Sequence, residues 1–351
     1  MSDKIGKIEK DLFEAFIAHQ CGHPRSEVIA GPGFGVDVSV VDLGNDKAMT
    51  LTSDPLSLIP SLGLEESAWL SVHLMANDMA TTGFAPMYGQ FVLNLPSTFS
   101  EVEFQRYWSY IHRYCQKLEM TITGGHTGFI EGQHSTIAGG GTFISIAPKK
   151  NIRLSKYAQP GNVILVTKSC AISSAAILAM SFPETVKAKA GHEIYHRACE
   201  SFYQTSSLPD ALAAVGENAS DSAVTALHDV TEGGVLGAIY EMAIASGNGV
   251  RVFNDHLPIS EVQATICKIF ELDPRYCIGA GSMIIACEKD ATDTVIARLH
   301  SEQIPCVAVG EFCPKEEGVT LVDSEYTRPL TYFDQDPYWA AFYKAIKLKW
   351  K

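Results

Sequence analysis

The sequence predicts an α+β protein that is built from two domains. Its 351 residues correspond to about two domains of ordinary size. In the first half, short apolar runs and patterns of helical spacing follow one another as strand, strand, helix, strand, helix, strand. The polar stretch Pro148-Lys-Lys-Asn151 then precedes a second series of alternating strands and helices. We therefore expect an N-terminal domain with a mixed sheet over residues 1–150 and a C-terminal α/β domain over residues 151–351.

The composition is that of a globular chain and argues against several classes of function. Hydrophobic residues make up 46% of the chain and charged residues 19%. The formal net charge of −13 disfavours nucleic acids and anionic membranes, which bind basic surfaces. The first 20 residues mix charges with apolar positions, unlike a signal peptide, and no segment has the about 18 uncharged apolar residues of a membrane span. We expect a cytoplasmic protein.

The cysteines indicate a reducing environment. There are nine, an odd number, and no two form a C-x-x-C pair, so they are interpreted as reduced thiols that lie mostly in cores. Cys170 precedes a helix predicted over residues 171–180, a position that lowers a thiol pKa. The alternative is a small residue at a tight turn between strand and helix.

Acidic residues lie near one predicted sheet edge of the first half. The strand over residues 48–52 runs into Ser53-Asp54-Pro55, where proline marks the point at which a strand leaves a sheet. A largely apolar helix follows and carries Asn77-Asp78, while Asp37 opens the strand over residues 37–43. Buried carboxylates need a cation or hydrogen-bond donors, so this pattern indicates a site for Mg²⁺ and a phosphate. The alternative for Asp78 is a polar residue near the end of its helix.

Three glycine-rich stretches carry further hypotheses. The run Gly31-Pro-Gly33-Phe-Gly35 precedes its strand, whereas a dinucleotide fingerprint must follow one, so we reject that reading. The stretch Gly124-Gly125-His126-Thr127 follows a strand and predicts a corner with exposed backbone and with imidazole and hydroxyl donors, although a plain turn has the same composition. Three glycines at 139–141, within a predicted strand, indicate close approach of another backbone or of a ligand.

The second half repeats the pattern of a strand that ends in an acid. A strand over residues 223–230 contains His228-Asp229, and Thr231-Glu232-Gly233-Gly234 leads into an apolar helix over residues 235–245. A glycine turn at a helix N-terminus is a ready site for an anion. The other predicted helices of this half cover residues 188–204, a short segment after Pro209, segments from 260 and 291, and an amphipathic tail over 337–351.

A competing motif points to zinc. His192-Glu193-Ile-Tyr-His196 matches the H-E-x-x-H pattern of zinc metalloproteases, and on a helix the two histidines would share one face. No third ligand follows at the expected spacing. An exposed helix with polar histidines is the alternative interpretation.

The ordered set of motifs resembles the aminoimidazole ribonucleotide synthetase superfamily, which includes thiamine-monophosphate kinase, selenophosphate synthetase and the hydrogenase maturation carbamoyl dehydratase. The resemblance spans nearly the whole chain and is carried by these stretches: Thr52-Ser-Asp54-Pro-Leu, Ala76-Asn-Asp78-Met-Ala-Thr-Thr-Gly83, Ile122-Thr-Gly-Gly-His-Thr127, His228-Asp-Val-Thr-Glu-Gly-Gly234, Leu272-Asp-Pro274, Gly279-Ala-Gly281 and Val309-Gly-Glu311.

This resemblance implies two α+β domains, a homodimer formed through the N-terminal domains, and ATP bound with Mg²⁺ in a cleft. It implies metal binding by Asp37, Asp54, Asp78 and Asp229, and catalytic roles for Asp54, Asp78 and His126. Residues near the nucleotide would be Asn77, Gly124, Gly125, Thr127, Gly233 and Gly234. The ATP γ-phosphate would activate an amide or carbonyl oxygen, or phosphorylate a small acceptor, and the acceptor would be a small molecule or a partner protein that bears a carboxamide.

The sequence also departs from the hydrogenase maturation branch. That branch uses a C-terminal cysteine, whereas this sequence ends in Trp350-Lys351, and Glu232 stands where that branch commonly has arginine. Three hypotheses follow: an ATP- and Mg²⁺-dependent enzyme, a nucleotide-binding partner protein without turnover, and a zinc hydrolase that acts through His192, Glu193 and His196.

Overall fold

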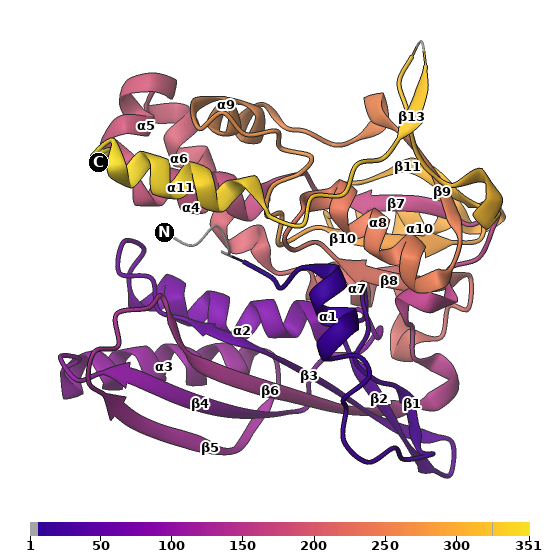
Figure 1. Ribbon diagram of the computed structural model, residues 1–351, viewed down its shortest axis with the longest axis horizontal. Helices are drawn as coiled ribbons and strands as arrows, with labels where there is room; N and C mark the ends of the chain where they lie inside the picture. Colours follow the sequence, from indigo (N-terminus) through magenta and orange to yellow (C-terminus); the bar gives the residue numbers. More distant parts are fainter. Residues whose placement is uncertain (1–5, 325) are drawn as a thin grey trace.

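The computed structural model describes residues 6–324 and 326–351, which form two β-sheets with helices packed against them (Figure 1). The six-stranded sheet has the order β1-β2-β3-β6-β4-β5, with β4 and β5 parallel and the other neighbours antiparallel. The seven-stranded sheet has the order β13-β12-β9-β11-β7-β10-β8, with β9 and β12 parallel. Both sheets are mixed, so the α+β prediction is confirmed.

The first half of the chain supplies the six-stranded sheet and three α-helices. Its strands are β1 (Val28–Ala30), β2 (Ser39–Gly44), β3 (Lys47–Ser57), β4 (Tyr88–Pro96), β5 (Thr121–Ile130) and β6 (Ile137–Pro148). Its helices are α1 (Lys10–Phe16), α2 (Leu64–Ala80) and α3 (Glu101–Lys117). The predicted domain boundary near residue 150 falls between β6 and the first strand of the other sheet.

The second half supplies the seven-stranded sheet and the remaining helices. Its strands are β7 (Val163–Thr167), β8 (Val224–Asp229), β9 (Gly249–Phe253), β10 (Met283–Cys287), β11 (Cys306–Cys313), β12 (Val319–Val322) and β13 (Thr327–Pro329). Its α-helices are α4 (Ile172–Ser181), α5 (Pro183–Ala190), α6 (His192–Glu200), α7 (Leu208–Val215), α8 (Gly234–Ser246), α9 (Glu261–Ile269), α10 (Thr292–Ser301) and α11 (Pro337–Lys347). No helix among the described residues combines the length and the apolar character that crossing a membrane requires.

Helix α2 lies between the six-stranded sheet and the second half of the chain (Figure 1). Glu65 and Glu66 occupy its first turn, where negative charge is favourable. One core cluster runs through both halves and includes Met75 of α2, Phe143 of β6 and Leu227 of β8. Because α2 is packed on both sides, its polar side chains are presented to the junction between the halves.

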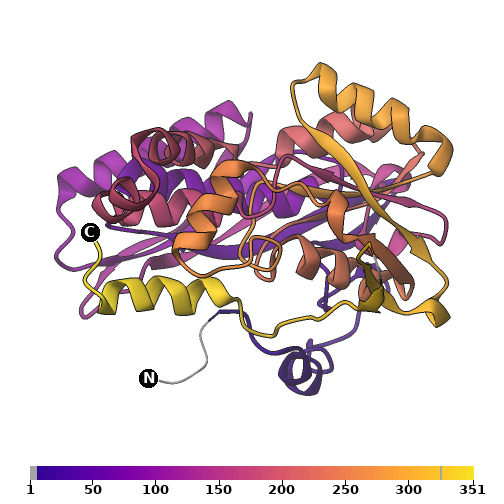
Figure 2. The same cartoon turned by 90° about the horizontal axis from the view of Figure 1, so that it is seen from above.

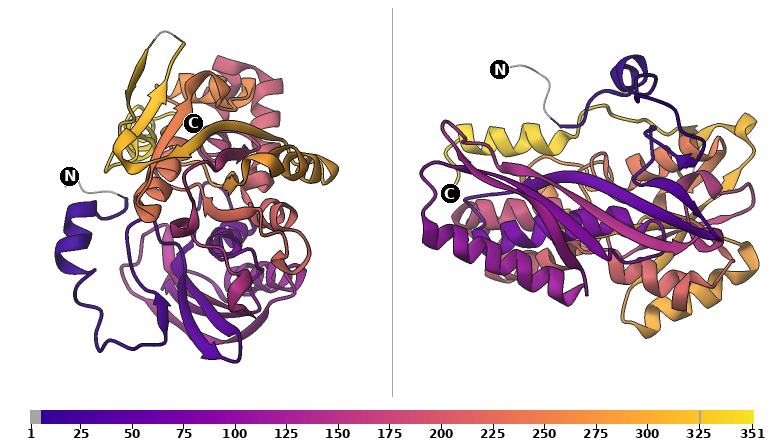
Figure 3. Two further views of the ribbon diagram at one scale, coloured as in Figure 1. Left: turned by 90° about the vertical axis from the view of Figure 1, so that its right-hand side faces the viewer. Right: turned by 90° about the horizontal axis from the view of Figure 1, so that it is seen from below.

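One face of the six-stranded sheet is uncovered in the described chain. Helices α2 and α3 pack on the other face, and the view from below shows the strands in front (Figure 3, right). Most residues of the edge strand β5 are exposed. Exposed apolar side chains on this sheet include Tyr88, Val92, Phe129, Ile137 and Ile146. Such a face is typical of a surface that another protein chain covers.

The structure corrects the predicted ends of two strands. Strand β3 continues through Asp54 and Pro55 to Ser57, with an irregularity in its pairing with β6 between Pro55 and Ser57. Proline lacks an N–H, and a bulge lets the strand continue past it. The stretch from Gly124 to Thr127 lies inside β5 and forms no corner, because it pairs in parallel with β4. A Cβ on Gly125 would lie 1.8 Å from the Phe91 carbonyl oxygen, so the neighbouring strand requires glycine there.

Other predicted helices and strands differ from the observed ones in their length or in their number. The helix predicted over residues 188–204 is divided into α5, α6 and a 3₁₀ turn, with Gly191 at a φ of 85° at the break. The helical spacing of apolar residues also predicts an opening helix over residues 4–19. Its predicted start at Lys4 lies outside the described residues, and within residues 6–19 the helix α1 extends only from Lys10 to Phe16. The short strands β1, β12 and β13 were not predicted. The close backbone approach expected at the 139–141 glycines is confirmed, since a Cβ on Gly139 would lie 1.8 Å from the Val92 carbonyl oxygen.

The cysteines are free thiols, as predicted, and seven of the nine are buried. Cys170 is one of the buried ones, and burial raises its pKa to about 12. The lowered pKa considered for its position is therefore wrong, because the loss of water around the thiolate outweighs the favourable helix end.

Candidate functional site

The structure brings four predicted acids together where α2 meets the second half of the chain. Asp54 lies on β3, Asp78 near the end of α2, Asp229 at the end of β8 and Asp37 just before β2. Burial is the main cause that raises the pKa of Asp54 to about 6 and that of Asp229 to about 7. The pKa of Asp78 is raised well above its ordinary value by burial and then by the charges of Asp229, Asp54 and Asp37. These four residues, here called the acid cluster, are close enough to repel one another.

The Asp78 carboxylate has a hydroxyl donor. Thr52 lies on β3 two positions before Asp54, and its Oγ1 donates to Asp78 Oδ2 at 2.7 Å. Thr52 and Asp54 share one face of β3, since alternate residues of a strand point to the same side. Thr52 therefore meets Asp78 of α2 on the face that carries Asp54. The hydroxyl therefore fixes the orientation of one carboxylate in the acid cluster.

A buried histidine joins Asp37 to the second half of the chain. His228 Nδ1 lies 2.8 Å from Asp37 Oδ2 and 3.0 Å from Ser155 Oγ, while its Nε2 lies 3.2 Å from Glu241 Oε2. Tyr332 donates its hydroxyl to Glu241 Oε1 at 2.9 Å. Burial opposes a charged imidazole, but Asp37 and Glu241 raise the pKa of His228 well above its ordinary value. The two carboxylates thus favour the charged form of His228, which pairs with Asp37.

His228 and Glu241 were not among the residues predicted for the site. Glu241 is the one charged residue in the apolar stretch 235–245, and a charge inside such a helix is a signal of a buried partner. Burial opposes its ionisation, yet Lys7, His228 and Tyr332 lower the pKa of Glu241 to about 2.

A second cation reaches the acid cluster from the N-terminal segment. Lys7 Nζ donates to Thr231 Oγ1 at 2.8 Å and lies 4.0 Å from Glu232 Oε2. Burial of the amino group opposes its charge, but the pKa of Lys7 is raised by Glu241, Glu232, Asp229 and Asp37. This residue too was missed, because its place in the chain, more than 200 positions before Thr231, gives no sequence signal of the contact.

The predicted anion site at the start of α8 is filled by a side chain of the same chain. The Gly233 N–H donates to Asp336 Oδ2 at 2.7 Å, and Asp336 also accepts a hydrogen bond from the Tyr338 N–H at 2.8 Å. Burial is the largest of the causes that raise the pKa of Asp336 to about 7. Gly234 has a φ of 64°, and a Cβ there would lie 2.6 Å from the Arg275 carbonyl oxygen. These glycines therefore pack the start of α8 against the chain itself.

Asn77 lies on a different face of α2 from the acid cluster and docks the two halves of the chain. Its Nδ2 donates to the Thr205 carbonyl oxygen at 2.9 Å, and its Oδ1 accepts from the Ser207 N–H at 2.7 Å. His73 and Trp69, one and two turns earlier, contact the side chains of Ser206 and Thr205 at 3.0 and 2.9 Å, respectively. We call Trp69, His73 and Asn77 the docking face of α2.

Within one chain, the residues of β5 that are predicted to lie near the nucleotide are distant from the acid cluster. Register across the sheet runs from Asp54 to Gly141, then to Phe91 and to Gly125. Three strand spacings separate Asp54 from Gly125, or about 14 Å. Gly124, Gly125, His126 and Thr127 therefore remain predicted nucleotide-side residues, and a ligand that contacts them together with Asp54 must span that distance.

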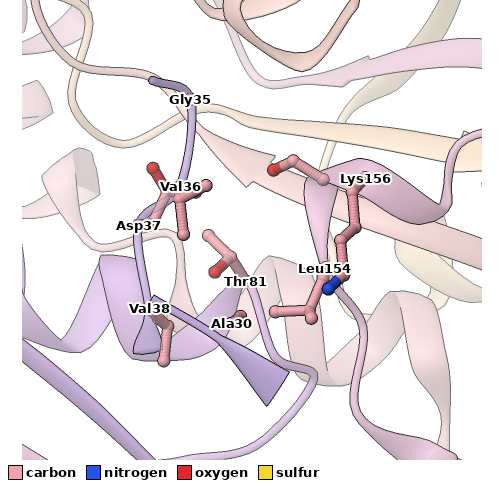
Figure 4. Close-up of a pocket in the computed structure, with 9 residues that line it drawn as sticks. Ala30, Gly35, Val36, Asp37, Val38, Thr81, Leu154 and Lys156 are labelled. Carbon is pink, nitrogen blue, oxygen red and sulfur yellow. The ribbon is translucent and has the colours of Figure 1, made fainter. Parts of the chain in front are cut away.

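The cavity beside Asp37 is small. Val36 and Asp37 lie on one side of it, Leu154 and Lys156 on the other, and Thr81 between them (Figure 4). Its volume is about 20 Å³, enough for roughly one water molecule. It is too small to hold a nucleotide.

The donor chemistry of the acid cluster fits Mg²⁺. Carboxylate oxygens are its preferred protein ligands, and the raised pKa values of Asp54 and Asp229 indicate negative charge that a cation would relieve. Within residues 6–324 and 326–351, no three His, Cys, Asp or Glu side chains are gathered closely enough to hold an ion by themselves. Mg²⁺ is commonly bound by one or two carboxylates together with water and substrate phosphates, so the acids fit a cation that arrives with a phosphate ligand.

The zinc motif lies on the surface, on α6. The rings of His192 and His196 are 6.4 Å apart between centroids, and Glu193 lies 3.9 Å from Arg197. In the described part of the chain no third metal ligand joins them. This arrangement matches an exposed helix with polar histidines.

Comparison with known proteins identifies the family. Two models of AIR synthase related proteins match, the N-terminal domain over residues 35–147 and the C-terminal domain over residues 159–323. A putative hydrogenase expression/formation protein of Methanocaldococcus jannaschii is 24% identical over 260 residues, 72% of each chain. The carbamoyl dehydratase HypE of Escherichia coli is 33% identical over 100 residues, which cover 28% of this chain and 30% of that protein.

Solved structures show the same fold. The hydrogenase maturation protein HypE in complex with ATP superposes with a TM-score of 0.68 at 20% identity, covering 86% of this chain and 89% of that one. The predicted resemblance is thus confirmed, and relatives with a stated activity, such as the carbamoyl dehydratase, are enzymes, in agreement with the expectation of an enzyme. The chain belongs to the AIR synthase-related family.

Proposed function

We propose that the protein is an ATP- and Mg²⁺-dependent enzyme that uses the ATP γ-phosphate to activate an amide or carbonyl oxygen or to phosphorylate a small acceptor. The observation that carries this proposal is the acid cluster at the junction of the two halves, in a chain of a family whose HypE member has been solved with ATP.

The roles of the residues follow from their chemistry. One or two carboxylates of the acid cluster (Asp37, Asp54, Asp78 and Asp229) would hold the cation together with phosphate oxygens and water. Thr52 would orient Asp78, and His228 would hold Asp37. Bound Mg²⁺ supplies neutralisation of the charge on the phosphates. The protein's own part is to position these groups, and the apolar core around α2 keeps the junction closed behind them.

The acceptor is proposed by chemical class. We propose a small molecule or a partner protein that bears a carboxamide, because the relatives include a carbamoyl dehydratase and a HypE protein solved in complex with HypF. His126 is the predicted catalytic residue on the nucleotide side.

We further propose that the protein is a homodimer that works in the cytosol. The uncovered sheet face with Tyr88, Val92 and Phe129 is an apolar surface that a second copy would cover. The free cysteines favour a reducing compartment. Sedimentation at several protein concentrations would test the dimer, and a Val92→Glu variant should be monomeric.

The first experiment measures binding by thermal stability. ATP at a hundred times its dissociation constant should add about 2.7 kcal/mol to the free energy of unfolding, and this gain should require Mg²⁺. Asp78→Asn should lose the Mg²⁺-dependent gain, whereas Asp46→Asn, at an exposed turn, should keep it. Wild-type protein that shows no gain with ATP and Mg²⁺ would refute the proposal.

A second experiment separates the enzyme from a silent nucleotide-binding protein. ADP release is followed with ATP, Mg²⁺ and a series of carboxamides and small alcohols. Turnover with one class of acceptor that Asp54→Asn abolishes supports the enzyme. Tight Mg²⁺-dependent ATP binding without ADP release under any acceptor would favour the silent binding protein.

A further inference from the structure

The segment in front of α1 crosses from the first half of the chain to the second. A Cβ on Gly6 would lie 3.3 Å from Trp339 Nε1 and 3.6 Å from Glu232 Oε1, so the backbone passes directly over both side chains. Helix α1 itself stands to one side of the sheets (Figures 2 and 3). Every described residue from Gly6 to Ile17 is exposed or half-buried. Apolar packing therefore contributes little to holding this segment in place.

Lys7 is the polar anchor of this segment. Its ammonium donates to Thr231 and lies near Glu232, on the turn that follows Asp229. Its charge also opposes the rise in pKa that burial causes at Asp54 and Asp229, and it helps to lower the pKa of Glu241. One side chain thus offsets negative charge that three elements, β3, β8 and α8, bring to the junction.

The two cations of the junction differ in how firmly they are held. His228 is buried, with 1% of its side chain exposed, and is fixed on both sides by Asp37 and Glu241. The Lys7 side chain is 52% exposed and belongs to the loosely packed N-terminal segment. Removing Lys7 from the junction disturbs little of the fold, whereas removing His228 would open the core.

A divalent cation and the Lys7 ammonium compete for the same negative charge. A cation at Asp229 and Asp54 adds positive charge beside the turn that carries Thr231 and Glu232, and so weakens the attraction that holds Lys7. The segment has few apolar contacts to replace that attraction.

We propose that Lys7 is a tethered counter-ion of the acid cluster: it holds residues 6–17 across the junction in the metal-free chain, and a divalent cation bound at the cluster releases this segment. The release half of this inference rests on the proposed Mg²⁺ site, whereas the anchoring half rests on the Lys7 contacts alone.

Hydrogen exchange of the full-length chain tests the anchoring half. Amides of α1 such as Phe13 and Ile17, which donate within the helix, are followed without metal in wild type, Lys7→Met and Lys10→Met. Exchange in Lys7→Met should be faster by about tenfold, the factor for losing one hydrogen bond to a charged group. Lys10→Met is the matched control, since Lys10 lies on the same segment but approaches Glu14 and Phe34. Equal exchange in wild type and Lys7→Met would overturn the anchoring.

The same measurement with Mg²⁺ alone, and with Mg²⁺ and ATP, tests the release. Wild-type exchange should rise to the level of Lys7→Met when the cation binds, and Lys7→Met should bind Mn²⁺, followed by electron paramagnetic resonance, about threefold more tightly. Wild-type protein that binds Mn²⁺ while α1 stays protected overturns the release and leaves the proposed function standing. Absence of Mn²⁺ binding in all variants overturns the proposed metal site and the release together, and the metal-free comparison still decides the anchoring.

Discussion

Helix α2 carries two adjacent polar residues that the protein uses in opposite ways. Asn77 belongs to the docking face, and both atoms of its amide are hydrogen-bonded to backbone groups of Thr205 and Ser207. Asp78, the next residue, faces a different direction and meets three other aspartates, whose charges add to burial in raising its pKa.

The difference separates a structural contact from a binding site. Neutral groups with complete hydrogen bonds hold two parts of a chain together at no electrostatic cost. Crowded carboxylates destabilise the free chain and are expected where a ligand supplies the missing charge. Position in the sequence alone does not distinguish the two, since they are adjacent polar residues on one helix.

Removing the docking amide should give the largest loss of stability. In Asn77→Ala the Thr205 carbonyl and the Ser207 N–H stay buried without partners, which should lower the free energy of unfolding by about 2 to 5 kcal/mol. Urea denaturation without ligand measures it. Asn151→Ala, which removes one exposed hydrogen bond to Asn218, should cost under about 1 kcal/mol and serves as the control. Equal costs for the two variants would contradict the docking role.

The docking face should also weaken in acid. Burial, followed by the charge of Lys117, lowers the pKa of His73 from 6.5 to about 3 in the folded chain. The unfolded chain then binds the extra proton, so His73 contributes stability above pH 6.5 that is lost as the pH falls towards 3. At pH 5.5 the loss should be about 1.4 kcal/mol. We expect the difference between wild type and His73→Gln to show this acid slope, and a difference that does not change with pH would refute it.

The acid cluster should show the opposite pH dependence. The folded pKa of Asp229, about 7, lies above its ordinary value of 3.8, so its contribution is most favourable at low pH and is lost as the pH rises through 7. Without metal, Asp229→Asn should therefore exceed wild type in stability at pH 8, and this advantage should be about 2 kcal/mol smaller at pH 5.5. Thermal unfolding in a chelator over that range measures it. An advantage that grows in acid would contradict mutual repulsion in the cluster.

The fold and the acids of the acid cluster could be predicted from the sequence, because both depend on local patterns. Apolar periodicity located α2 and the strands around it, and the motifs that carry the family resemblance contain Asp54, Asp78 and Asp229. A charged residue within an otherwise apolar stretch of the sequence indicates such a site.

The partners of those acids could not be predicted, because they depend on contacts between distant segments. Lys7 reaches Thr231, and Asp336 reaches Gly233, over separations of 224 and 103 positions. The Gly233-Gly234 turn has the composition of an anion site whether the anion is a phosphate or the carboxylate of Asp336. The sequence likewise showed Asn77 beside Asp78 but not that their side chains face different neighbours.

The hydroxyl that orients Asp78 should have the smallest effect, and on binding more than on stability. Thr52→Val keeps the shape of the side chain and removes the 2.7 Å hydrogen bond to Asp78. The carboxylate then loses its fixed orientation, and ATP with Mg²⁺ should bind about threefold more weakly, or by about 0.7 kcal/mol, in isothermal titration. Thr50→Val is the matched control on the same strand face, because its hydroxyl contacts Met79 Sδ at 3.1 Å and no acid of the cluster. If both variants weaken binding equally, the effect comes from packing of β3 on α2. If Thr52→Val alone does so, the acid cluster depends on the hydroxyl that orients Asp78.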